Sequence, residues 1–222
     1  MIAKRSSSRN KQRQPEQESC LSRERIASAA VELLDEKGVA GLTMRQLADR
    51  LGSGVMSLYW HVNNKENVFD LALDSVFEYS NPPEMAEAQD WREEIFHVLE
   101  DWRAVMLRHP WSASLLPRRT LGQNILNRLE LLSATLSSVG VKDADLNVAI
   151  WTLWNYVMGA TVTRASFTFV ATDRAESQPR VEPISGRNPT IERTRLLLDD
   201  DWDGVFRKGL GILLEGLAPR QP

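Results

Sequence analysis

The segment at residues 41–65 restricts the possible folds more than any other part of the chain. It reads GLTMRQLADRLGSGVMSLYWHVNNK. Thr43 and Gln46 have the T-x-x-Q spacing of a capping box, in which threonine accepts a hydrogen bond from a free backbone N–H and glutamine bonds back. This spacing predicts that a helix begins here. Gly52 ends that helix, because glycine adopts the left-handed backbone of many helix ends without a steric clash.

A second short helix is predicted almost directly after this turn. Ser53 can cap it, and the helix covers about residues 54–61. A longer helix precedes the segment, from Ser22 until Gly38 stops the run of apolar residues at helical spacing. Three helices with so short a turn between the second and the third form a helix-turn-helix arrangement. In this arrangement the third helix lies in the DNA major groove, with its N-terminal residues toward the base edges.

The rest of the chain is also predicted to be helical. Asn63, with Glu66 at the third position, is expected to cap a fourth helix that runs to about Tyr79. Further apolar repeats predict helices at about residues 91–109, 111–116, 121–138, 143–169 and 201–217. The composition of residues 172–189 is typical of a mobile loop. No strand pattern or internal repeat competes with an all-α fold.

Charge is unevenly distributed along the chain. Residues 1–65 carry 11 Lys and Arg against 7 Asp and Glu, a net charge of +4, whereas the remaining residues carry 16 against 23, a net charge of −7. An acidic protein can therefore still present a nucleic-acid surface at its N-terminal end. Residues 1–18 are polar and basic, and we expect a disordered arm that either reaches DNA or remains an unstructured tail.

The composition also bears on where the protein acts. The single cysteine, Cys20, cannot form an intramolecular disulfide. No apolar run approaches the roughly 20 residues that span a bilayer, and the first residues lack the apolar stretch of a secretory signal. We therefore expect a soluble, cytoplasmic protein without a membrane partner.

The run AAVELLDEKGVAGLTMRQLADRLGSGVMSLYWHVNNKENVFDLAL resembles the DNA-binding domain of TetR-type bacterial repressors, particularly the tetracycline-repressor branch. The similarity is strong over about residues 21–73 and elsewhere rests mostly on helix order and length. It implies a homodimeric, all-α repressor that binds a palindromic operator and is released by a small molecule. The implied domains are a helix-turn-helix DNA-binding domain at residues 19–67 and a helical effector-binding and dimerisation domain at residues 68–222.

The resemblance assigns DNA contacts residue by residue. Arg45 matches an arginine that reads guanine, which suits the bidentate geometry of guanidinium. Val55, Met56 and Ser57 match base-contacting positions, but the first two cannot hydrogen-bond to bases, so thymine methyls or DNA shape are expected targets and the operator should differ. The positions that match phosphate contacts are Thr43, Tyr59, His61 and Lys65.

The residues between these contacts are expected to pack inward. Leu58 and Val62 look like the packed face, with Trp60 partly buried beside them. The alternative is that Tyr59 and Trp60 are ordinary core aromatics and that Arg45 is only a solvated charge.

The effector is expected to bind between helices of the larger domain, where apolar and aromatic groups with a few polar ones line such sites. The candidate residues are Trp102, Met106, Leu116, Asn147, Ile150, Trp151, Trp154, Asn155 and Met158. Ordinary core packing is the alternative for each. By rough alignment Asn81, Val98 and Leu116 replace residues that hold tetracycline and its magnesium. We therefore expect no metal, and an effector that is larger, flatter or more apolar than tetracycline.

Two further expectations concern partners and chemistry. The last helix and part of the 143–169 helix match the family's four-helix dimer interface. His61, His97 and His109 have no metal-ligand spacing, and no catalytic or cofactor fingerprint is present, so neither an enzyme nor a cofactor is expected. The alternatives to a repressor are an effector-independent architectural DNA-binding protein and a helical protein-interaction module.

Overall fold

The computed structural model describes residues 21–78, 90–173, 189–194 and 201–217. These residues form helices and no strand, which confirms the predicted all-α class. The elements in chain order are α1 (Arg23–Gly41), α2 (Met44–Arg50), α3 (Val55–Leu58), α4 (Lys65–Val76), α5 (Trp91–Arg108), α6 (Pro110–Leu115), the 3-10 turn η1 (Leu116–Arg118), α7 (Gln123–Ser138), α8 (Asp143–Asp173), α9 (Pro189–Thr194) and α10 (Trp202–Leu217).

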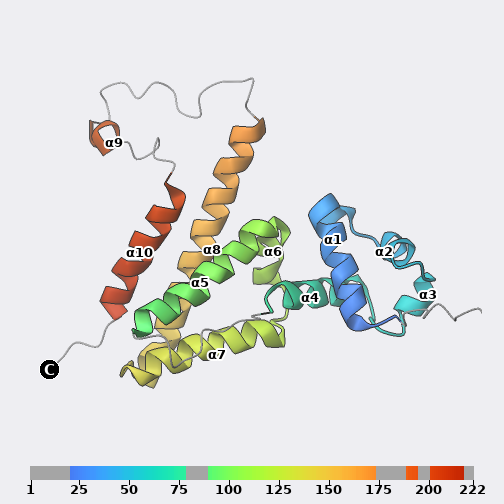
Figure 1. Cartoon of the computed structure of the whole chain (residues 1–222), viewed down its shortest axis with the longest axis horizontal. Helices are drawn as coiled ribbons and strands as arrows, with labels where there is room; N and C mark the ends of the chain where they lie inside the picture. The colour runs from blue at the N-terminus through green and yellow to red at the C-terminus, as the bar shows by residue number, and fades with distance from the viewer. Residues whose placement is uncertain (1–20, 79–89, 174–188, 195–200, 218–222) are drawn as a thin grey trace, which may run out of the picture.

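The helices form two groups that α4 and α6 connect. In Figure 1 the first three helices lie at one end of the molecule, and α5, α7, α8 and α10 form a bundle at the other. Within the first group α1 packs on both α2 and α4. In the bundle α5 contacts α7, α8 and α10, while α6 packs against α1 and also against α5 and α8. The chain thus has a small helical unit in direct contact with a larger one.

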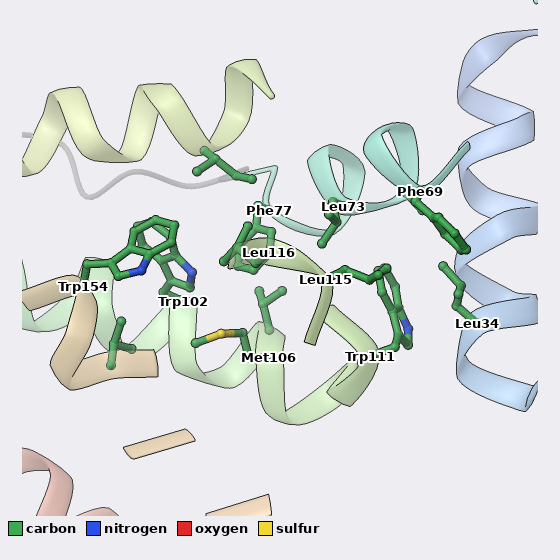
Figure 2. Packing of buried hydrophobic residues seen from close by; sticks show 14 of the residues in the cluster. Leu34, Phe69, Leu73, Phe77, Trp102, Met106, Trp111, Leu115, Leu116 and Trp154 are labelled. Carbon is green, nitrogen blue, oxygen red and sulfur yellow. The ribbon is translucent and has the colours of Figure 1, made fainter. Parts of the chain in front are cut away.

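A continuous apolar core runs through both groups. Figure 2 shows buried side chains in a row from Trp154 and Trp102 in the bundle to Phe69 on α4 and Leu34 on α1. The two groups therefore share one apolar core.

The turn between α2 and α3 has the predicted geometry. Thr43 precedes α2, and its Oγ1 accepts a hydrogen bond of 3.2 Å from the backbone N–H of Gln46. The return half of the capping box is not formed, because Gln46 Oε1 has no hydrogen-bond partner. Gly52 has φ of 63°, the left-handed conformation that its residue type predicts.

Two predicted caps are wrong by one residue. Gly54 precedes α3, no side chain caps that helix, and Ser53 Oγ has no partner. Asn64 caps α4, with its Oδ1 2.9 Å from the N–H of Asn67. Asn67 Oδ1 in turn accepts from the N–H of Asn63, the residue before the cap, so Asn67 bonds back in place of the predicted Glu66.

Several helix ends also differ from those predicted. The apolar run stops at Gly38, whose φ of 66° kinks the chain, but the helix resumes to residue 41. The helix α3 ends at Leu58 rather than at about residue 61, and α4 ends at Val76 rather than at about Tyr79. Residues 172 and 173 belong to α8 and Pro189 begins α9. The predicted arm at 1–18, the remainder of the predicted loop and Asn81 lie outside the described residues.

Candidate functional site

The predicted DNA-contact residues lie together at the tip formed by α2, α3 and the start of α4. The exposed members are Thr43, Arg45, Met56, Ser57 and Tyr59, and the half-buried members are Val55, His61 and Lys65. Leu58 and Val62 are almost fully buried in the apolar core, which confirms that they form the packed face of the tip. The side chain of Met56 is 75% exposed. Met56, one of the predicted base contacts, therefore presents apolar atoms to solvent, whereas Val55 packs partly against the core.

Two arginines on α2 have different environments. Arg50 is bound to α1, with its two terminal nitrogens 2.8 Å and 2.5 Å from the oxygens of Glu36 and a further contact of 3.2 Å to Glu32. Its hydrogen bond with Glu36 raises the pKa of Arg50 and lowers that of the carboxyl group. Arg45 is exposed and has no ion pair among the described residues. Arg50 thus holds α2 in place, and Arg45 remains available to a ligand.

Trp60 contradicts the sequence-based expectation of partial burial, because 87% of its surface is exposed. The reason is its place in the turn. Leu58 and Val62 are four residues apart and share the inward side, so the residue midway between them points outward. Together with Tyr59 it forms an exposed aromatic pair beside the tip. The inward positions predicted for Leu58 and Val62 were enough to predict that Trp60 points outward.

A stripe of carboxylates along α4 joins the small unit to the bundle. Glu66, Asp70 and Asp74 are spaced by four residues and so lie on one face. Arg119, just after η1, binds Asp70 through Nε at 2.8 Å and also contacts both the carboxylate and the backbone carbonyl of Glu66. The hydrogen bond with Asp70 raises the pKa of Arg119. The four-residue spacing of these carboxylates could be read from the sequence, but the residues that pair with them could not.

The same stripe continues onto α7. Asp74 accepts a hydrogen bond of 2.8 Å from the backbone N–H of Asn124, and its backbone carbonyl accepts one of 2.9 Å from the Asn124 amide. A Cβ at Gly122 would lie 2.2 Å from the Asp74 carboxylate, so only glycine allows this approach. The buried Arg128 donates from Nε to the Phe77 carbonyl at 2.9 Å, which anchors the end of α4.

A second polar contact joins α1 to the turn between α5 and α6. One carboxylate oxygen of Asp35 lies 2.8 Å from His109 Nδ1 and accepts a hydrogen bond of 2.7 Å from Trp111 Nε1. We call this the Asp35 clasp. It attaches α1, on which α2 and α4 pack, directly to the beginning of α6.

Aromatic rings form a chain inside the bundle. Trp102 on α5 is edge-to-face with Trp154 on α8 at a centroid distance of 5.1 Å, and with Phe77 at the end of α4 at 5.7 Å. Met106 and Leu116 lie beside them (Figure 2). Trp151 extends the chain outward, with its ring 5.7 Å from that of Trp154. The rings therefore connect the surface of α8 to the helix that leads to the tip.

The structure separates the predicted effector residues into two groups. Trp102, Met106, Leu116 and Trp154 are buried, and Ile150 and Met158 pack partly buried against the same core. Asn147, Trp151 and Asn155 lie on the exposed side of α8, where they line a shallow surface hollow of about 300 Å³. The predicted residues thus do not form a single pocket in this conformation. Val98, expected to replace a polar drug contact, is buried in the apolar core.

The described residues form neither a metal site nor a membrane span. No group of three or more His, Cys, Asp and Glu side chains there is arranged to hold a metal ion. None of the helices in that part of the chain has the length and hydropathy needed to cross a bilayer.

An exposed helix-turn-helix tip, attached to a larger helical bundle with a buried aromatic cluster, defines the class of helical DNA-binding regulators. Residues 26–72 match the family described as bacterial regulatory proteins, tetR family, and residues 82–220 match the tetracyclin repressor-like C-terminal domain. The chain belongs to the TetR family of transcriptional repressors.

Individual relatives agree with this assignment. The chain is 37% identical over 201 residues to an HTH-type transcriptional regulator of Saccharopolyspora erythraea, covering 89% of this chain and 85% of the relative. Among solved structures it resembles the Streptomyces coelicolor TetR family protein ActR in complex with actinorhodin, with a TM-score of 0.75, 27% identity and coverage of 90% and 96%. It also resembles BioQ with its double-stranded DNA operator, with a TM-score of 0.63, 28% identity and coverage of 90% and 99%.

Proposed function

We propose that this protein is a ligand-responsive transcriptional repressor in the cytoplasm, which binds a palindromic operator as a homodimer and is released by a small apolar or aromatic effector. One observation carries this proposal. The helix α4 begins at Lys65 beside the DNA-facing tip and ends where Phe77 meets Trp102 in the bundle. A ligand that displaces the aromatic cluster would therefore move the helix that supports the tip.

The proposed DNA contacts follow from the exposed chemistry of the tip. Arg45 reads guanine, and Val55, Met56 and Ser57 face base edges, where the apolar pair selects thymine methyls or groove shape. Lys65 lies with its Nζ 5.1 Å from the centre of the Phe69 ring, which orients the ammonium group. The proposed phosphate contacts are Thr43, Tyr59, His61 and Lys65. We add Trp60, whose exposed ring packs against the DNA sugars.

Two resembling structures support the two binding activities. The BioQ structure contains a DNA operator and the ActR structure contains actinorhodin. The aromatic cluster around Trp102 and Trp154 is the apolar region of this chain that an effector would enter. We propose that Met106, Leu116, Ile150 and Met158 complete its lining. Asn147, Trp151 and Asn155 would contribute only from the outer side of α8.

A homodimer is proposed through the outer faces of α8 and α10. Each helix leaves large apolar residues exposed there, namely Val148, Trp151 and Val162 on α8, and Val205 and Ile212 on α10. Apolar surface of this extent is usually covered by a partner. A two-fold dimer would place two tips in successive major grooves, which requires two half-sites about 34 Å apart.

The decisive experiment measures binding to the promoter region beside the gene for this protein. We expect binding that is salt-dependent and at least about a thousandfold tighter than binding to random DNA of the same length. An architectural DNA-binding protein would bind both DNAs with similar affinity, and a protein-interaction module would bind neither. Addition of aromatic candidate ligands should lower operator affinity, and an effector-independent protein would show no such change.

Two substitutions separate base reading from phosphate binding. Arg45→Lys keeps the charge but loses the bidentate geometry, so it should cost about 1 to 3 kcal/mol at one base position and relax selectivity there. Lys65→Ala should weaken binding to all sequences alike and reduce the salt slope by about one. Fluorescence anisotropy with single-base operator variants at several salt concentrations measures both effects. Indistinguishable behaviour of the two variants would refute the assigned roles.

A further inference from the structure

The indole N–H of Trp102 is a hydrogen-bond donor without an acceptor. Only 1% of the Trp102 surface is exposed, and Nε1 makes no hydrogen bond in the structure. Buried tryptophans usually find a partner for this group, because an unmet donor in an apolar core costs free energy. A phenylalanine at this position would fill most of the same space without that cost. The hydrogen bonds of the described residues therefore give no structural reason for an indole nitrogen at this position.

Among the described residues, those that the structure places around the Trp102 ring offer no suitable acceptor. Trp154 and Phe77 meet its ring at interplanar angles of 82° and 60°, and Met106 and Leu116 lie nearby. An aromatic face or a thioether accepts only a weak hydrogen bond. A trapped water molecule needs two to four polar partners, and apart from indole N–H groups these side chains have no polar atom. A bound molecule that carries an acceptor atom would satisfy this donor.

We propose that the effector is a planar, fused-ring aromatic molecule that carries a carbonyl oxygen, and that Trp102 Nε1 donates a hydrogen bond to this oxygen. The inference rests on the proposed ligand-responsive function, since it assigns the ligand class of the same cluster. The rings of Trp154 and Phe77 supply flat apolar surfaces for the fused rings. A site with a buried donor discriminates strongly against an analogue that lacks the acceptor, because the donor then stays unmet.

The test compares two probes that differ only at the proposed contact. 9-Fluorenone and fluorene have the same three-ring body, with a carbonyl group in the first and a methylene group in the second. Equilibrium dialysis of the full chain against micromolar probe measures both affinities. We expect fluorenone to bind about tenfold more tightly, equivalent to about 1.4 kcal/mol. Non-specific partition into an apolar core would instead favour fluorene, which is the more apolar of the two.

Two variants locate the contact. Trp102→Phe removes the N–H, and we expect the preference for fluorenone to fall to within about twofold. Trp91→Phe is the matched control, since it removes an indole N–H from the start of the same helix, away from the Trp102 ring cluster, and it should retain the preference. Equal affinities in the unmodified protein, no binding of either probe, or a preference that persists in Trp102→Phe would each overturn the proposal. If Trp102→Phe does not fold, the relative affinity of the unmodified protein for the two probes decides whether the proposal stands.

Operator binding, measured separately without probe, distinguishes the two proposals. Selective operator binding without a carbonyl preference would remove the inference about Trp102 and leave the repressor function in place. A carbonyl preference without selective operator binding would remove the repressor function and leave the inference about the Trp102 contact in place.

Discussion

At the residue scale, Tyr156 and Gly209 show how closely α8 and α10 approach each other. The Tyr156 hydroxyl donates to the Phe206 carbonyl at 2.8 Å, and its ring stacks on that of Phe206. A Cβ at Gly209 would lie 2.2 Å from the hydroxyl oxygen and 3.0 Å from the ring carbon that bears it. Glycine is thus required at this position by a neighbouring side chain rather than by its own backbone.

This contact predicts opposite effects for two glycines of α10. Gly209→Ala forces Tyr156 to move and should lower the free energy of unfolding by about 1 to 3 kcal/mol. A Cβ at Gly211 meets no atom within 4 Å, so Gly211→Ala should instead raise it by up to about 1 kcal/mol through helix propensity. Urea unfolding at one fixed protein concentration measures both variants. Similar stabilities for the two variants would argue against the observed packing of Tyr156.

Prediction from sequence was least successful for single residues. The cap of α4 was placed one residue too early because the adjacent candidates Asn63 and Asn64 are the same residue type. The cap of α3 was placed at Ser53 because its hydroxyl can accept a hydrogen bond, whereas that helix follows Gly54 and has no side-chain cap. Trp60 was expected to be partly buried because large aromatic residues usually are, whereas its position between Leu58 and Val62 decides otherwise. For Trp60, the spacing of Leu58 and Val62 was a better guide to burial than the residue type.

At the scale of elements, the helices and their order followed from apolar periodicity, but the two faces of α8 did not. This helix is apolar nearly all round, so spacing cannot tell its inner side from its outer side. Trp151 and Trp154 are only three residues apart, yet the first is 51% exposed and the second 9%. The predicted effector residues therefore included members of both faces. The positions of α5, α6, α7 and α10 determine which side is covered.

The attachment of α10 should depend on pH. The carboxylate of Asp203 lies 2.7 Å from Arg103 of α5 and also contacts Arg164 of α8. Its hydrogen bond with Arg103, assisted by the charge of Arg164, lowers the pKa of Asp203. A lowered pKa gives stability that is fully present above the unfolded value of about 3.9 and is lost as the pH falls through the folded value.

We therefore expect the stability difference between the natural protein and Asp203→Asn to be present at about pH 5 and to shrink below about pH 3.9. The effect should be small, because 64% of the Asp203 side chain is exposed and solvent screens the pair. Thermal unfolding of both proteins across this pH range measures it. A difference that stays constant with pH would show that the carboxylate charge contributes nothing.

At the scale of the whole molecule, the proposed dimer predicts an effect of charge on the outer face of α10. Ile212→Asp places a carboxylate in the proposed interface and should convert dimers to monomers, with a large loss of operator affinity because each half-site is then bound alone. Leu126→Asp is the control, since Leu126 is also exposed but lies on α7. Sedimentation velocity separates the outcomes. Dissociation by both substitutions, or by neither, would count against an α8 and α10 interface.

The Asp35 clasp and the carboxylate stripe of α4 have a consequence for how such proteins can be recombined. Asp35, Glu66, Asp70 and Asp74 precede residue 78, whereas their partners His109, Trp111, Arg119 and Asn124 follow residue 90. A chimaera that exchanges the DNA-reading half with that of a relative cuts between the members of every pair. Operator choice can therefore be exchanged separately from ligand choice only when the residues that pair across this boundary are exchanged together.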